Sequence, residues 1–183
     1  MGKFAVIDTE TNWSDQVISI GIVIADSDTF QALDLRYYVL PRECQVGGMY
    51  EHTLFIETPV QPILCSRAQA MGDILSWVRS HGIRALFAYN ACFDRNHLPE
   101  LRSFDWHDIL RLAAYRQHNP RIPAYLECCS TGRLKRGYGV ESMLRLLSGR
   151  TDYHESHNAC HDALDELEIM RLLKHRIADY PKL

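Results

Sequence analysis

Two acidic residues, separated by one residue, follow the first apolar segment of the chain. Asp8 and Glu10 lie in the sequence FAVIDTET at residues 4–11. In extended backbone, side chains two positions apart project to the same side, so both carboxylates can reach one ion. Mg²⁺ and Mn²⁺ prefer carboxylate oxygen and are often held by one or two carboxylates together with a substrate phosphate. The pair therefore indicates a divalent-cation site, although acidic residues also end many strands simply as turn formers.

The second candidate segment is AYNACFD at residues 88–94, which contains the acidic residue Asp94. A predicted strand over 83–89 ends here and a predicted helix over 92–102 begins, which places Asp94 in the first helical turn. Open α/β sheets bind ligands at the carboxyl ends of their parallel strands, so this position favours a role in binding. The alternative is that Asp94 only interacts with the helix dipole.

The third candidate segment is SHNACHDALDE at residues 156–166. His157 precedes the last predicted helix, 158–178, and Asp162 lies within its first two turns beside an apolar stripe. A carboxylate next to a core costs desolvation energy unless a cation meets it, and a metal ion would do so. The remaining acidic residues of this helix are predicted to be solvated charges. They are Asp165, Glu166 and Glu168.

The order of apolar segments predicts how these residues are positioned. Segments 3–9, 17–25 and 30–40 are rich in β-formers and joined by short polar links, which favours an antiparallel meander because parallel neighbours need a long crossover. Strands and helices then alternate, which is typical of parallel βα units. Two further strands are expected over 83–89 and 104–108, and helices over 66–81, 92–102, 109–117, 140–147 and 158–178. We therefore predict an α/β fold with a mixed five-stranded sheet, three antiparallel then parallel strands, and helices on both faces.

Two long segments have no predicted helix or strand. Residues 41–62, with two glycines and three prolines, read as irregular, and residues 119–139 are long enough to form a binding loop or lid. Residues 111–136 carry six basic side chains against Glu127 alone, a density that could track a phosphodiester backbone. The alternative for these charges is a solvated loop without a partner.

Composition restricts the class of protein. The 183 residues are 46% hydrophobic and carry a net charge of −3, which predicts one globular domain over 1–183 and argues against a protein that coats nucleic acid by bulk charge. The longest apolar run, 17–25, is too short to cross a membrane, and the first residues do not resemble an export signal. Six scattered cysteines without such a signal favour reduced thiols and a cytoplasmic location.

The three acidic segments together resemble a known family. FAVIDTET, AYNACFD and HNACHDA are similar, in this order, to the three motifs of the DEDDh 3′-to-5′ exonucleases, which include bacterial proofreading subunits, oligoribonuclease and ribonuclease T. Three short patterns at the ends of predicted strands and helices are more specific together than any one alone. The second motif, N-A-x-F-D, is present as Asn90, Ala91, Phe93 and Asp94, and the third, H-x-A-x-x-D-A, as His157, Ala159, Asp162 and Ala163.

The resemblance implies a ribonuclease-H-like fold, two Mg²⁺ or Mn²⁺ ions and a histidine general base. It implies that one ion activates water while the other stabilises the leaving 3′ oxygen. His157 occupies the base position of the motif. His154 lies outside it, and His161, adjacent to Asp162, should point away around the helix. The implied metal ligands are Asp8, Glu10, Asp94 and Asp162, and with His157 they form the implied catalytic set.

The expected activity is 3′-5′ exonucleolytic hydrolysis of a single strand to nucleoside monophosphates, with DNA favoured over RNA. An oligoribonuclease-like RNA-trimming enzyme is one alternative. A catalytically silent nucleic-acid-binding or adaptor protein on the same fold is another. A DNA polymerase or a second copy of the chain is left open as a protein partner. The residues expected to contact the nucleic acid are Thr9, Thr11, Asn90, Arg133, Lys135 and Arg136.

Overall fold

A six-stranded mixed sheet forms the centre of the protein, which is described over residues 2–183 by a computed structural model. The strand order is β4-β3-β2-β1-β5-β6. The first three strands pair antiparallel, β5 and β6 continue the sheet in parallel with β1, and β4 adds in parallel to β3. The strands are β1 (Lys3–Thr11), β2 (Val17–Asp26), β3 (Ala32–Val39), β4 (Ile63–Leu64), β5 (Ala85–Ala88) and β6 (Asp105–Asp108).

The predicted sheet was one strand short. The predicted antiparallel-then-parallel order is confirmed, but β4 adds a sixth strand at the edge beside β3. Two residues are too few to produce a periodic pattern in the sequence, and both side chains of β4 are exposed, so no apolar alternation marks it. Its pairing comes only from contact with the edge of β3, with Ile63 opposite Tyr38.

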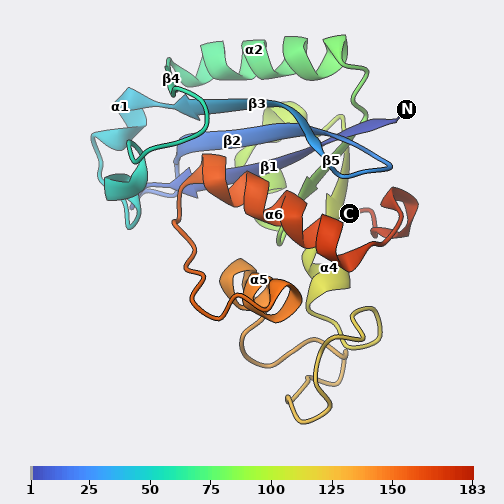
Figure 1. Cartoon of the computed structure of the whole chain (residues 1–183). Helices are drawn as coiled ribbons and strands as arrows, with labels where there is room; N and C mark the ends of the chain where they lie inside the picture. Colours follow the sequence, from blue (N-terminus) through green and yellow to red (C-terminus); the bar gives the residue numbers. More distant parts are fainter. Residues whose placement is uncertain (1) are drawn as a thin grey trace.

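Helices cover both faces of this sheet (Figure 1). The longest two are α2, which lies on one face, and α6, which crosses the other (Figure 1). Alternating side chains of β1 explain the two layers: Phe4 and Val6 belong to the core with α5 and α6, whereas Ala5 and Ile7 belong to the core with α2. The helices are α1 (Pro41–Cys44), α2 (Arg67–Ser80), α3 (Cys92–His97), α4 (Leu110–Ala113), α5 (Val140–Ser148) and α6 (Ala159–Leu173), with 3-10 turns η1 (Glu51–Thr53), η2 (Pro99–Leu101) and η3 (Ile177–Asp179).

Three predicted helices are shorter in the structure. The helix expected over 92–102 ends at His97, and Pro99, which lacks an N–H to continue it, begins the turn η2. The helix expected over 109–117 is the single turn α4. The last helix ends at Leu173 because Lys174 takes a left-handed conformation with φ of 59°. Residues 41–62, expected to be irregular, contain α1 and η1.

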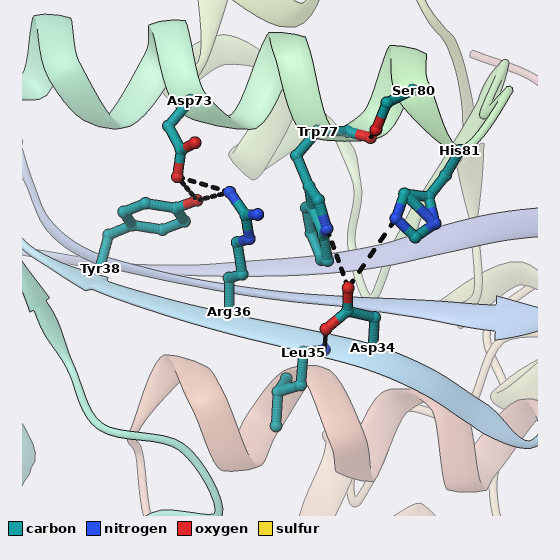
Figure 2. Close-up of polar contacts among 8 residues, drawn as sticks. All are labelled: Asp34, Leu35, Arg36, Tyr38, Asp73, Trp77, Ser80 and His81. Atoms are coloured by element: carbon teal, nitrogen blue, oxygen red, sulfur yellow. Dashed lines mark hydrogen bonds and ion pairs between the residues drawn. The ribbon is translucent and has the colours of Figure 1, made fainter.

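Polar contacts fix α2 across β3 (Figure 2). Trp77 donates from its indole N–H to Asp34 at 3.0 Å, and the Arg36 guanidinium lies 4.6 Å from the centre of the Trp77 ring. Asp73 accepts from Arg36 at 2.6 Å and from the Tyr38 hydroxyl at 2.7 Å. Because every second residue of β3 takes part, the contacts hold α2 in one register along the strand.

The N-terminus of α6 approaches the sheet at Gly21 of β2. A Cβ atom at Gly21 would lie 1.8 Å from the carbonyl oxygen of Ala159, so only glycine permits this contact. The close approach brings the start of α6 against the middle of the sheet, opposite Asp8, which pairs with Gly21 in the β1–β2 register. Within residues 2–183, no helix is both long and apolar enough to cross a membrane.

Candidate active site

Asp8 and Glu10 lie at the end of β1, on the face that α6 covers. Their side chains lie on the same side of β1 as those of Phe4 and Val6, because side chains alternate along a strand. Both carboxylates therefore point toward α6, which packs on that side. The β1–β2 register shifts between Glu10 and Thr11, which marks a bulge at the end of the strand. The predicted projection of Asp8 and Glu10 to one side therefore agrees with the sheet geometry.

Asp94 approaches the same strand end from α3. It lies in the first turn of that helix, and its side chain is 2% exposed. The Thr9 hydroxyl donates to Asp94 at 2.8 Å, so α3 is tied to β1 next to the acidic pair. Asn90, just before α3, is exposed in a left-handed conformation with φ of 63°, and its backbone N–H donates to Asp108 at 3.1 Å. Thr9 was predicted to contact the nucleic acid, and in the structure its hydroxyl donates to Asp94 instead of facing a free surface group.

His157 and Asp162 come from the start of α6. Asn158 caps this helix by accepting from the backbone N–H groups of Cys160 and His161, which fixes where the helix begins. One ligand atom from each of Glu10, His157 and Asp162 lies within 4.8 Å of the other two. Glu10 of β1 and two residues from the start of α6 thus converge at a distance suited to a single ion or a bound water.

The other two histidines of this region contact different groups. The Nε2 of His161 donates to the carbonyl oxygen of Glu57 at 2.8 Å. His154 is exposed, and its Nδ1 lies 3.0 Å from a guanidinium nitrogen of Arg145. His157 alone of the three belongs to the group that includes Glu10 and Asp162.

The acidic residues of the site lie close together, with Asp94 and Asp162 buried and Asp8 and Glu10 half-buried, and this raises their pKa values. Desolvation is the largest cause for Asp8, Glu10, Asp94 and Asp162, and neighbouring carboxylates add to it for the first two and for Asp162. The pKa of Glu10 is raised to about 8. One carboxylate oxygen each of Asp8 and Asp162 is buried without a hydrogen-bonding partner among residues 2–183. Such groups need a proton or a cation, so the site is chemically suited to hard metal ions.

Two further acidic residues belong to this cluster and were missed in the sequence. Glu166 was predicted to be solvated, but it is 1% exposed, and its Oε2 is buried without a partner within residues 2–183. It lies four positions after Asp162 on the same helix face, and its charge is the largest neighbouring contribution that raises the pKa of Asp8. Glu155, before α6, raises the pKa of both Glu10 and Asp162. The i, i+4 spacing from Asp162 was the available signal for Glu166.

Asp165 and Glu168, which were predicted to be solvated together with Glu166, are less buried than Glu166. Asp165 is half-buried and accepts from the Tyr153 hydroxyl, and Glu168 forms an ion pair with Arg171 at 2.6 Å. Whether an acidic residue on α6 is solvated therefore depends on which side of the helix meets the sheet.

The three basic residues predicted to guide a strand line two different cavities. Arg133 lies over the Tyr138 ring at 4.4 Å and lines a cavity of about 290 Å³ that also includes Asn90, Arg111 and Lys182. Lys135 and Arg136 instead line a cavity of about 370 Å³ with Tyr125. Only the first cavity contains a residue of the second motif, Asn90. Thr11 lies half-buried at the bulge that ends β1.

Comparisons with known proteins place the fold. No family model matches the sequence, and no curated protein matches it. Among solved structures, the nuclease domain of 3′hExo, a DEDDh family member bound to rAMP, superimposes with a TM-score of 0.66 at 12% identity. The match covers 99% of this chain and 96% of that domain. The chain has the fold of DEDDh exonuclease domains.

Two other solved structures agree with this assignment. A full-length 3′-exonuclease matches with a TM-score of 0.63 at 12% identity, covering 99% of this chain and 90% of that one. E. coli Exonuclease I in complex with a 5cy-dT13 oligonucleotide matches with a TM-score of 0.63 at 13% identity, covering 98% of this chain. The DEDDh exonuclease fold seen here spans 41% of the Exonuclease I chain. The ribonuclease-H-like fold predicted from the three motifs is therefore confirmed.

Proposed function

We propose that the protein is a 3′-5′ exonuclease that hydrolyses single-stranded nucleic acid to nucleoside monophosphates, using two Mg²⁺ or Mn²⁺ ions. In this proposal residues 1–183 act as one exonuclease domain. The observation that carries it is the convergence of Glu10, His157 and Asp162 within 4.8 Å, beside the half-buried Asp8, in a DEDDh exonuclease fold. A fold that only bound nucleic acid would have no need to bury several carboxylates without a basic partner.

The donor set suits the proposed ions. Carboxylate oxygen is the ligand that Mg²⁺ and Mn²⁺ prefer, and Mg²⁺ usually keeps positions open for water and substrate phosphate. The ligands in this proposal are Asp8, Glu10, Asp94 and Asp162, of which Asp8 and Asp162 each have a buried oxygen without a partner within residues 2–183. When bound, the ions supply positive charge to the phosphate oxygens and lower the pKa of a coordinated water.

In the proposed mechanism, His157 accepts the proton of the attacking water. A neutral imidazole is suited to this task near pH 7, and Glu10 and Asp162 lie close enough to the imidazole to hold that water beside it. Thr9 restricts the orientation of Asp94 through the 2.8 Å hydrogen bond to one of its carboxylate oxygens. Asp8, on the same side of β1 as Glu10, lies close enough to the other acids for their charges to raise its pKa.

The substrate in this proposal is the 3′ end of a single strand. It is supported by the solved neighbours, of which one is bound to rAMP and another to a single-stranded oligonucleotide. DNA is favoured, and RNA oligonucleotides are the alternative. The cavity that includes Asn90 is lined by three basic side chains against one acidic one, Asp108, at the carboxyl end of the parallel strands, where a phosphodiester backbone can leave the site. The basic residues are Arg111, Arg133 and Lys182.

The experiment that tests the function uses 5′-labelled single strands of DNA and RNA of equal sequence, with Mn²⁺, Mg²⁺ or a chelator. We expect a ladder of products that shorten by one nucleotide and that form only with metal. Release of internal fragments first would indicate an endonuclease. Intact substrate under every metal condition, with binding retained, would favour the adaptor alternative. The relative rates on the two strands decide between DNA and RNA.

We expect Arg133→Ala to weaken single-strand binding more than Lys135→Ala with Arg136→Ala. Arg133 shares its cavity with Asn90, whereas Lys135 forms an ion pair with the exposed Glu127 at 3.1 Å. Losing one phosphate contact should lower affinity several-fold and reduce the slope of log K against log salt by about 0.7. Fluorescence anisotropy with a labelled oligonucleotide across a salt series measures both. Arg171→Ala, which removes an exposed charge of α6, is the matched control. An unchanged slope for Arg133→Ala would contradict a path of the strand through the cavity that Arg133 lines.

A further inference from the structure

A tyrosine that the sequence did not single out stacks on His157. The ring centres of Tyr50 and His157 are 4.0 Å apart and the rings are inclined by only 18°. Both side chains are half-buried, so one face of the imidazole is covered by the phenol while its edge remains within reach of the site. Tyr50 precedes the turn η1 and belongs to a segment far from His157 in the sequence.

The same segment also holds the backbone of His157. His157 has a positive φ of 50°, an unfavourable conformation for a non-glycine residue that surrounding contacts must maintain. The Thr53 hydroxyl donates to the His157 carbonyl oxygen, and the Asn158 amide donates to the Thr53 carbonyl oxygen at 2.7 Å. Thr53 and Asn158 are buried, so these bonds are shielded from water. Residues 50–53 therefore contact both the backbone and the ring of His157.

Stacking restricts the rotation of the imidazole. A ring covered in parallel by a second ring at 4.0 Å cannot turn about its Cβ–Cγ bond without losing that contact. In the observed orientation, a ring nitrogen of His157 lies within 4.8 Å of ligand atoms of Glu10 and Asp162. Burial and the nearby carboxylates of Glu10, Glu155 and Asp162 raise the pKa of Tyr50, so its phenol stays neutral and adds no charge to the site.

We propose that Tyr50 is a positioning residue for His157: its ring holds the imidazole facing Glu10 and Asp162, where His157 would take a proton from water. This inference rests on the proposed exonuclease function. It concerns the orientation of the base and not the binding of substrate, because the contact exists between two side chains of the protein itself. It also assigns a purpose to residues 50–53, which the sequence marked only as irregular.

The kinetic test compares two substitutions of Tyr50. Tyr50→Leu removes the ring, and we expect kcat to fall by about 10- to 100-fold with KM changed less than about two-fold, as for a misplaced catalytic group. Tyr50→Phe keeps the ring and should retain kcat within about three-fold, because the proposed contact needs no hydroxyl. Phe55→Leu, an aromatic-to-leucine change at a 66% exposed side chain of the neighbouring segment, is the matched control and should leave both constants unchanged.

Three kinetic outcomes would overturn the inference. An unchanged kcat for Tyr50→Leu would show that the stack does not orient the base. A rise in KM with kcat preserved would place Tyr50 in substrate binding. Equal losses for Tyr50→Phe and Tyr50→Leu would assign the effect to the hydroxyl group. Thermal unfolding of each variant shows whether a loss of activity reflects a loss of the fold.

A spectroscopic arm tests the contact without using activity. The imidazole proton resonances of His157, assigned by their absence in His157→Gln, should carry an upfield ring-current shift in the metal-free protein. We expect this shift in wild type and Tyr50→Phe and its loss in Tyr50→Leu. If wild type has no exonuclease activity, the proposed function fails while this measurement still decides whether Tyr50 orients His157. A resonance that does not move in Tyr50→Leu would overturn the stacking contact itself.

Discussion

Asp162→Asn is expected to lower kcat/KM by about 100- to 1,000-fold, the size of effect that the loss of a group acting on transition-state charge produces. Asp162 is 3% exposed, and one of its oxygens lies among the ligand atoms contributed by Glu10 and His157. Asparagine keeps the size of the side chain but replaces one anionic oxygen by an amide nitrogen, which cannot bind a hard cation. The variant should also bind Mn²⁺ more weakly in a calorimetric titration.

Glu168→Gln is the matched control for this substitution. It makes the same carboxylate-to-amide change on the same helix, at a residue whose contact is an exposed ion pair with Arg171. We expect its activity to equal that of wild type. Activity of Asp162→Asn within ten-fold of wild type, measured in saturating Mn²⁺ on a labelled single strand, would remove Asp162 from the proposed ligand set.

The second large effect concerns stability without metal. Metal-free protein should unfold at a lower temperature at pH 8.5 than at pH 5.5, by on the order of 10 °C, since several kcal/mol are involved and each shifts the midpoint by about 2–4 °C at this chain length. The pKa of Glu10 is raised from 4.5 to about 8, and burial raises the pKa values of Asp8, Asp94, Asp162 and Glu166. Differential scanning fluorimetry in a chelator measures the midpoint.

The sign follows from proton binding. An acid whose folded pKa is raised binds more protons in the folded than in the unfolded state, so its stabilising contribution is complete below the unfolded pKa. The contribution is lost as pH rises toward the folded pKa, which for Glu10 means between about 4.5 and about 8. Below this pH window, carboxylates with lowered pKa values, such as Asp73 beside Tyr38 and Arg36, make the protein less stable as the pH falls. The comparison of pH 5.5 with pH 8.5 avoids that range.

Metal should reverse this loss. Ions bind the deprotonated carboxylates, so the stabilisation by Mn²⁺ should increase from pH 5.5 to pH 8.5. Glu166→Gln, which removes one buried charge, should raise the midpoint of the metal-free protein at pH 8.5, and Glu168→Gln should not. A midpoint that is flat or rises over this pH range in chelator would contradict the description of these acids as buried without compensating charge.

Local patterns in the sequence determined much of the site. The i, i+2 spacing of Asp8 and Glu10 on an apolar strand was enough to direct both to one face, because side-chain alternation in a strand is independent of what the strand packs against. Asp94 in the first turn of a helix, and Asp162 beside an apolar stripe, were likewise positioned by short-range geometry. The antiparallel-then-parallel order of the sheet followed from the lengths of the links between strands.

The tertiary structure alone decided which additional residues belong to the site. Glu166 has the sequence neighbours of a solvated helix residue, and it is buried because it lies on the side of α6 that packs against the sheet. Tyr50 lies in a segment without periodic pattern, and its contact with His157 depends on hydrogen bonds between Thr53 and residues 157–158. Arg133 lines a different cavity from Lys135 and Arg136, although all three lie within four residues of the same irregular loop. Spacing along one strand or helix is set by local geometry, whereas contacts between segments about 100 residues apart exist only once the chain has packed.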